Sequence, residues 1–470
     1  MTAHLSTWPG RILARPWLLL FVPVNAATSG FGVMLPLLIL LRLHGTLLDV
    51  ALAATLFNGA VIGASVLWGY LSDRWPDRRL FLVLNFAGYA VIYAVLGAFP
   101  SLPLLLGLYT VVGLLAPAGA SASNLLILER FPETERGRGF ASFQEMSIFG
   151  SIAGVIVGYL WLLDGGALPP LLFVFAALAA ASTVAALAAV GPSTRRLTTG
   201  HVAGHPESLI SRLRESTALR AIIPFFPGRP GRPDRPLRRL GHWAAREIRE
   251  EIALILTASF LFTFASNLFN TSYTPYMESV GISSAAIFLV NGGNNTAQGL
   301  FFPLSGTLAA REGSDRLVRQ STYFRSLGYL AMAGFTFLPV GVGIAFGANL
   351  VVFAGLGAAI ALYSTASTLL LFRGLEGHPP GTFLGVNSAL GGGAAVLGAG
   401  LSGLLSYYGS YRLTFLASAA ALLVSLPVWS AVEVAYARRH GPPGPGARGR
   451  PPPPSEAPTP APERRAAPPS

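Results

Sequence analysis

Long apolar runs alternate with short polar segments along almost the whole chain. Each run has about 20 residues or more, the length that a helix needs to cross the hydrocarbon core of a bilayer. The runs predict six spans at residues 17–41, 48–68, 80–99, 104–128, 140–163 and 171–190, and six more at 252–277, 285–308, 321–340, 345–372, from about 383, and 413–436. The pattern therefore predicts an all-α membrane protein of twelve transmembrane helices in two related, pseudo-symmetric six-helix halves.

Arginines gather in every second polar segment. They lie in the N-terminal tail, in the loops after spans 2, 4, 6, 8 and 10, and in the C-terminal tail, whereas the other side carries only Arg42 and Arg412. Loops rich in basic residues face the cytoplasm. We therefore expect a multi-pass protein of the cell membrane with both termini in the cytoplasm.

The same alternation divides the chain into five segments. Residues 207–220 and 237–251 combine arginine with apolar residues, which is typical of helices that lie on an anionic membrane surface. The C-terminal tail is rich in proline and glycine, which predicts disorder. The expected segments are an N-terminal cytoplasmic tail (1–16), a first half (17–190), a cytoplasmic linker with amphipathic helices (191–250), a second half (251–437) and a disordered Pro-rich tail (438–470).

The composition limits the class of protein and the kinds of functional site that the chain can contain. Charged residues make up 11% of the 470 residues, against about 25% in soluble domains. Cysteine is absent, which excludes disulfides and thiolate sites, and no histidine lies inside an expected span, so we expect neither metal nor cofactor. All 33 basic residues are arginine, which indicates a GC-rich, prokaryotic genome. The net charge of +12 fits contact with anionic lipid headgroups rather than nucleic acid.

The strongest motif lies between spans 2 and 3. A glycine, an aspartate and three arginines have fixed spacing there, at Gly69, Asp73, Arg74, Arg78 and Arg79. The segment is a charged turn at the membrane surface, and its aspartate can face the N-terminal dipole of a neighbouring helix or pair with an arginine. Such contacts would latch the cytoplasmic helix ends together in one state of the protein and release them in another.

This spacing resembles the loop between helices 2 and 3 of the major facilitator superfamily, with Pro76 in place of an inner glycine. A weaker echo in the second half keeps Gly306 and Arg311 but has Ala310 in place of the aspartate. The resemblance implies two six-helix halves, alternating access and a solute bound near the membrane midplane between the halves. Proline-acidic-arginine-glycine sequences in the loop after span 4 support the resemblance less strongly.

Polar side chains inside the spans are candidates for solute binding. Asn291, Asn294, Asn295 and Gln298 share one helix face, because offsets of three, four and seven residues return to the same side. These amides could bind a solute with hydroxyl or amide groups, or they could hydrogen-bond to other helices. Further candidates on spans 1, 4, 7 and 11 are Asn25, Asn124, Asn267, Asn270, Tyr273 and Asn387. The resemblance implies that helices 1, 4, 7 and 10 line the central cavity.

Two charged residues lie within expected spans. Glu145, about a turn and a half into span 5, is the candidate proton carrier, although it could instead pair with a loop arginine. Arg325 in span 9 is expected to be structural or to extend its guanidinium to the membrane surface.

These features favour a secondary transporter that exports a small organic solute, with proton antiport as a hypothesis. One alternative is an uncoupled facilitator or importer of a neutral polar solute such as a sugar. Another is a non-transporting receptor or scaffold that docks partners through its linker and tail. No nucleophile–base pair is visible, so we do not expect an enzyme. We expect the protein to act as a monomer.

Overall fold

The computed structural model describes residues 16–75, 77–131, 136–191, 250–338, 341–374 and 380–440. The expected linker, the amphipathic segments within it and both expected tails lie almost wholly outside these residues. Every element of the described part is a helix.

The first half consists of six membrane-length helical segments. The first segment joins a 3-10 turn, an α-helix and a π-helical turn: η2 (Pro16–Leu20), α2 (Phe21–Leu37) and η3 (Leu38–Arg42). The other five helices are α3 (Leu47–Arg74), α4 (Arg78–Ala98), α5 (Leu102–Arg130), α6 (Arg136–Leu163) and α7 (Leu168–Ala189). Local signals set the ends: Thr46 and Asp49 form a capping box on α3, and Asp77 accepts a hydrogen bond from the Arg79 N–H at the start of α4.

The second half also has six helices. They are α11 (Glu250–Ser279), α12 (Ser284–Glu312), α13 (Ser314–Phe335), α14 (Val342–Gly374), α15 (Pro380–Tyr408) and α16 (Tyr411–His440). Ten of the twelve segments are long and apolar enough to cross a membrane by themselves; α12 and α13 are not among them. The row of amides in α12 and the charged residues of α13 lower their hydropathy, so these two helices depend on their neighbours. The expected all-α fold of twelve helices is confirmed.

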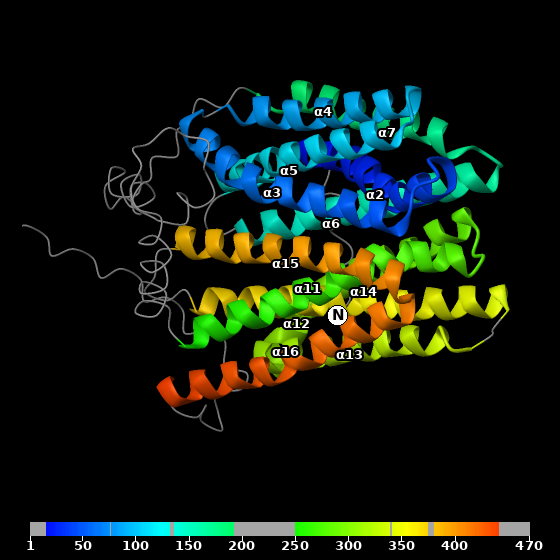
Figure 1. Cartoon of the computed structure of the whole chain (residues 1–470). Coiled ribbons are helices and arrows are strands. Elements are labelled where there is room, and N and C mark those ends of the chain that lie inside the picture. Colours follow the sequence, from blue (N-terminus) through cyan, green and yellow to red (C-terminus); the bar gives the residue numbers. More distant parts are fainter. Residues whose placement is uncertain are drawn as a thin grey trace, which may run out of the picture.

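The helices run roughly parallel and form two bundles, α2–α7 and α11–α16 (Figure 1). The bundles meet along two helix pairs, α3 with α15 and α6 with α12, which together we call the seam. Small residues allow this close approach: Gly403 faces Ala51, and Gly292 faces Val155. Glycine at such positions lets two backbones come near one another.

The two ends of the molecule differ in charge. The arginine end carries Arg78, Arg130, Arg311 and Arg373, whereas the opposite end carries Arg42 and Arg412. The chain enters α2 and leaves α16 at the arginine end.

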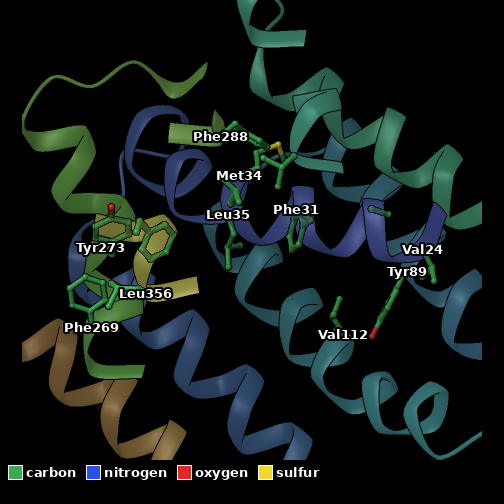
Figure 2. Close-up of a cluster of buried hydrophobic side chains, with 14 of the residues drawn as sticks. Val24, Phe31, Met34, Leu35, Tyr89, Val112, Phe269, Tyr273, Phe288 and Leu356 are labelled. Atoms are coloured by element: carbon green, nitrogen blue, oxygen red, sulfur yellow. The ribbon is translucent and has the colours of Figure 1, made fainter. Parts of the chain in front are cut away.

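Buried apolar side chains join the two bundles near the opposite end. Figure 2 shows Met34 and Leu35 of α2 between Phe31 on one side and Phe288 and Tyr273 of the second bundle on the other. Met34 and Phe288 are fully buried. Since such a cluster excludes water, the space between the bundles is closed at the opposite end.

Candidate functional site

A cavity of about 180 Å³ lies in the second bundle, between α11, α14 and α15. All its lining residues come from the arginine-end halves of these three helices. They are Leu256, Ser259, Phe260, Thr263, Tyr363, Ser367, Thr368, Leu371, Asn387, Leu390 and Gly391. The cavity is thus near the arginine end, whereas the bundles are closed at the opposite end.

The cavity wall is rich in hydroxyl groups and carries no charged side chain among its lining residues. Thr368 donates a hydrogen bond to the Ser364 carbonyl at 2.7 Å, and Ser367 donates a longer one of 3.3 Å to the same oxygen. Asn387 forms no hydrogen bond with any residue that the structure describes, so its amide offers both donors and an acceptor. The wall can therefore hydrogen-bond to a polar solute.

Of the candidate binding residues expected from the sequence, only Asn387 lies in this cavity. Sequence reasoning missed Ser259, Thr263, Ser367 and Thr368. The signal that could have found them is a four-residue spacing of hydroxyl side chains in apolar helices, at Ser259 and Thr263 and again at Tyr363 and Ser367, because that spacing puts each pair on one helix face.

The row of amides on α12 lies outside this cavity, and its N–H groups donate hydrogen bonds to atoms of the helices themselves. Asn294 Nδ2 donates to the Phe353 carbonyl of α14 at 2.7 Å, and Gln298 Nε2 donates to Asn294 Oδ1 at 2.6 Å. Asn295 Nδ2 reaches Ser29 Oγ of the first bundle at 3.3 Å. The row therefore joins α12 to α14 and, across the bundles, to α2.

Asn291 and the candidates on the other helices are dispersed. Three amides donate to carbonyls one turn back on their own helices: Asn291 to Ile287, Asn25 to Phe21 and Asn267 to Thr263. Asn124 and Asn270 are exposed. Tyr273 is buried in the core of the second bundle, and its hydroxyl donates to the Asn349 carbonyl at 3.4 Å. The structure does not gather these residues into one site.

The motif after span 2 is described only in part. Helix α3 ends at Arg74, and the side chains of Gly69, Asp73 and Arg74 are outside the described part. Arg78 Nε pairs with Glu129 Oε1 of α5 at 3.1 Å, with both side chains almost fully buried. In the second half, Gly306 and Arg311 are exposed at the arginine end of α12.

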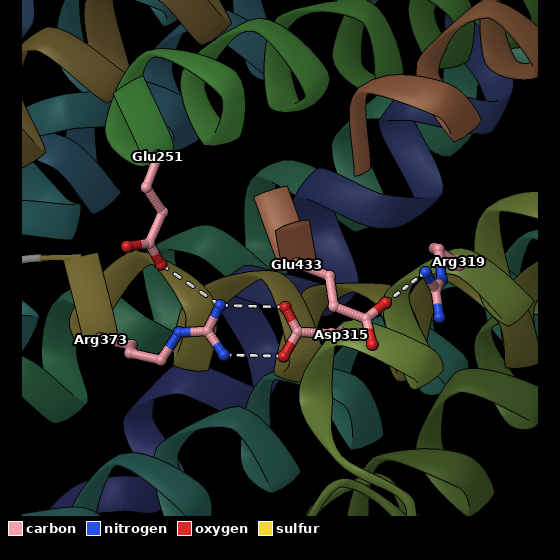
Figure 3. A network of polar contacts seen from close by, with 5 residues as sticks. All are labelled: Glu251, Asp315, Arg319, Arg373 and Glu433. Atoms are coloured by element: carbon pink, nitrogen blue, oxygen red, sulfur yellow. Dashed lines mark hydrogen bonds and ion pairs between the residues drawn. The ribbon is translucent and has the colours of Figure 1, made fainter. Parts of the chain in front are cut away.

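A larger ion network holds the arginine end of the second bundle together (Figure 3). Arg373 of α14 binds Asp315 of α13 through both Nη atoms, at 2.7 and 2.9 Å, and reaches Glu251 of α11 at 3.3 Å. Its guanidinium also lies 3.9 Å from the ring centroid of Tyr436 of α16. Burial alone would lower the pKa of Arg373, but Asp315 and Glu251 raise it above its usual value, so the guanidinium stays charged.

The two halves carry these ion pairs at corresponding places with opposite signs. In the first half the arginine, Arg78, begins the third helix and the acid, Glu129, ends the fourth. In the second half the acid, Asp315, begins the third helix and the arginine, Arg373, ends the fourth. Both pairs join the same two helices of their bundle, so each can hold the arginine end of its own half.

Glu145 is half-buried and faces the seam. It shares one face of α6 with Ile148 and Val155, which contact Gly299 and Gly292 of α12. Glu145 lies one turn closer to the arginine end than Ile148. No ion pair joins it to any residue within the described ranges.

Arg325 does not extend to the surface, contrary to one of the two expectations from the sequence. Its side chain is 3% exposed, and it donates from Nε to the Tyr329 hydroxyl at 2.8 Å and from Nη1 to the Leu356 carbonyl at 3.3 Å. The guanidinium carbon is 5.3 Å from the ring centroid of Phe262. These internal partners hold the charge inside the second bundle.

Comparison with known proteins gives a family and a fold. The Major Facilitator Superfamily profile matches residues 17–392. No curated protein matches the chain. Similar solved structures include the nucleoside transporter NupG (13% identity, TM-score 0.62, covering 89% of this chain and 98% of that one) and a partially occluded inward open form of the xylose transporter XylE from E. coli (16%, 0.60, 92% and 97%). A third is a POT family transporter in complex with a thioalcohol conjugated peptide (13%, 0.67, 91% and 96%). At these identities the likeness concerns the fold alone.

Proposed function

The chain belongs to the major facilitator superfamily, and from that premise we propose that it exports a small organic solute by alternating access, in exchange for protons. The observation that carries the proposal is an asymmetry between the two ends of the molecule. Apolar packing closes the space between the bundles at the opposite end, whereas a polar cavity within the second bundle lies near the arginine end. Alternating access needs such a one-sided arrangement in each of its two states.

We assign the arginine end to the cytoplasm, because basic loops remain on that side. This conformation is then the inward-facing state. The two bundles would exchange it for an outward-facing state by rocking about the seam, where Gly403 and Gly292 let the helices move past one another. Both sides of the seam come from one chain, which supports a working monomer in the cell membrane.

We assign proton carriage to Glu145. Its carboxyl group is half-buried on the seam face of α6 and is not neutralised by a described basic residue. A carboxyl group in such a place can take up a proton when it faces one side and lose it when it faces the other. Movement of the bundles about the seam would change which side Glu145 faces.

A second candidate function is uncoupled movement of a neutral polar solute. The hydroxyl-rich, uncharged lining of the cavity favours it. The scaffold alternative would depend on the expected linker and the expected C-terminal tail, which lie almost wholly outside the described part, and has no support from the described helices.

Proton movement in everted vesicles tests the main proposal. A pH-sensitive dye reports the response to a panel of organic acids, cationic drugs, sugars and amino acids. We expect a solute-driven proton efflux that disappears in Glu145→Gln and persists in Glu433→Gln, a control that removes an exposed carboxylate paired with Arg319. Solute uptake without proton movement would reject antiport and support the uncoupled carrier. No solute movement in tight vesicles that contain the protein would reject transport of this panel.

A further inference from the structure

Arg325 places a positive charge inside the second bundle, and no carboxylate of the described helices lies beside it. The acids of the surrounding helices lie at the helix ends: Glu251 and Asp315 bind Arg373 and Glu433 binds Arg319 at the arginine end. Glu278 lies in the last turn of α11 at the opposite end, near Tyr411. Asp315 precedes Arg325 by ten residues on α13, which corresponds to about 15 Å along a helix. Among the described residues, none forms an ion pair with Arg325.

The charge of Arg325 is therefore only partly compensated. Arginine remains protonated in proteins, and a buried charge is costly unless it is paired. The guanidinium group has five N–H donors, and within the described part of the chain two hydrogen bonds, both to uncharged oxygens, satisfy them. The aromatic faces of Phe262 and Tyr329 offset part of the remaining cost of burying this charge. A positive potential remains around the side chain.

This potential reaches the cavity through two stacked rings. The guanidinium carbon lies 5.3 Å from the Phe262 centroid, and the Phe262 and Tyr363 rings stack in parallel with centroids 3.3 Å apart. Tyr363 is part of the cavity wall. The charge is thus on the order of 9 Å or less from the Tyr363 centroid, close enough to act through a medium of low dielectric constant.

We propose that the cavity between α11, α14 and α15 binds the anionic group of a small organic acid, and that Arg325 sets this preference without touching the solute. This assignment rests on the proposed transport function and names its class of cargo. The Asn387 amide provides hydrogen-bond donors for the anion, and the Ser367 hydroxyl can exchange its long 3.3 Å bond to the Ser364 carbonyl for one to the anion. The volume of about 180 Å³ is below the roughly 300–1,000 Å³ of sites for drug-sized ligands, which limits the cargo to a small acid.

The natural absence of cysteine allows the potential to be measured directly. Ser367→Cys puts a single thiol in the cavity. Ser121→Cys puts a reference thiol at a comparable level of α5, in a bundle whose arginines all lie at helix ends. The full-length chain in vesicles is treated with an anionic methanethiosulfonate (the sulfonatoethyl compound) and a cationic one (the trimethylammonioethyl compound). The ratio of the two reaction rates reports the sign of the local potential, and the anionic reagent is itself a small organic acid.

We expect the anion-to-cation rate ratio to be higher for Ser367→Cys than for Ser121→Cys. Arg325→Met should lower the ratio at Ser367→Cys by about tenfold or more, and Arg325→Lys should restore most of it. A structural role for Arg325 would leave the ratio unchanged, and an unchanged ratio overturns the proposal. If Arg325→Met does not fold, equal ratios at Ser367→Cys and Ser121→Cys overturn it.

The outcomes separate this inference from the proposed function. A ratio that depends on Arg325, together with failure to move any solute, would reject transport and keep the positive site. Transport of a solute with a ratio independent of Arg325 would keep the transporter and reject its preference for acids.

Discussion

The ion network around Arg373 supports a quantitative prediction about the stability of the second bundle. Arg373→Met keeps the apolar part of the side chain but removes the charge that Asp315 and Glu251 share. Breaking a fully buried pair costs about 3–5 kcal/mol. Because the Arg373 and Asp315 side chains are each 22% exposed, part of that loss is recovered by water, and we expect about 2–3 kcal/mol.

A double-mutant cycle isolates the pair. We expect Asp315→Asn and Arg373→Met together to cost less than the sum of the two single changes, with a coupling of about 1.5–3 kcal/mol, as for hydrogen bonds between charged groups. Reversible unfolding of the purified protein in mixed micelles, with increasing fractions of SDS, measures each free energy. Lysine keeps the charge but loses the bidentate geometry. The free energy of unfolding of Arg373→Lys should therefore lie between those of wild type and Arg373→Met.

The same network contains its own control. Arg319 pairs with Glu433 nearby, but its side chain is 31% exposed and that of Glu433 is 51% exposed. Exposed pairs contribute about 0–1 kcal/mol, so Arg319→Gln should have little effect. A coupling between Asp315 and Arg373 below about 0.5 kcal/mol, or an effect of Arg319→Gln as large as that of Arg373→Met, would show that burial and geometry do not set these energies.

Three further predictions concern the seam, the amides and the driving force. Gly403→Leu should push α15 away from Ala51, open the opposite end and lower transport severalfold, as judged by uptake and thiol labelling. Gly393→Ala should leave transport unchanged, because its added methyl group meets no neighbouring atom. Asn294→Leu should cost about 1–3 kcal/mol in the SDS assay, because it removes the bond between α12 and the Phe353 carbonyl and leaves Gln298 Nε2 without its acceptor, and Asn124→Leu at an exposed position should cost far less. If a monovalent anion leaves as one proton enters, each cycle moves two charges, so an interior-negative potential of 100 mV supplies about 4.6 kcal/mol and transport should accelerate with the potential. A rate that is independent of an imposed potassium diffusion potential would exclude that stoichiometry.

Most of the fold follows from the sequence because membrane spans depend on length and apolarity. The expected helices agree with the structure to within a few residues at most ends, but α13 begins at Ser314 rather than near residue 321. Its first two turns carry Asp315, Arg316 and Arg319, which hydropathy counts against a span, although Asp315 and Arg319 are bound by partners on α14 and α16. A hydropathy average over one helix cannot detect that its charged residues are paired with charges on other helices.

The candidate site could be predicted less well from the sequence, for a similar reason. The amides of α12 were predicted to bind solute because they are numerous. In the structure, however, Asn294 and Asn295 donate to neighbouring helices. The cavity depends on isolated hydroxyls such as Ser259 and Ser367, which are common in membrane helices and stand out only when three helices bring them together. The position of Arg325 could not be predicted either, since two of its partners, the Phe262 ring and the Leu356 carbonyl, come from other helices and only Tyr329 is on its own helix.

The reversed order of the ion pairs also has a consequence for how the chain assembles. Two bundles with the same helix arrangement risk exchanging equivalent helices while they insert one after another. If α4 met α14 in place of α5, Arg78 would face Arg373, and if α13 met α5 in place of α14, Asp315 would face Glu129. Like charges brought together away from water repel strongly. Exchange of equivalent helices would thus place like charges together, so the opposite polarity of the two pairs disfavours it.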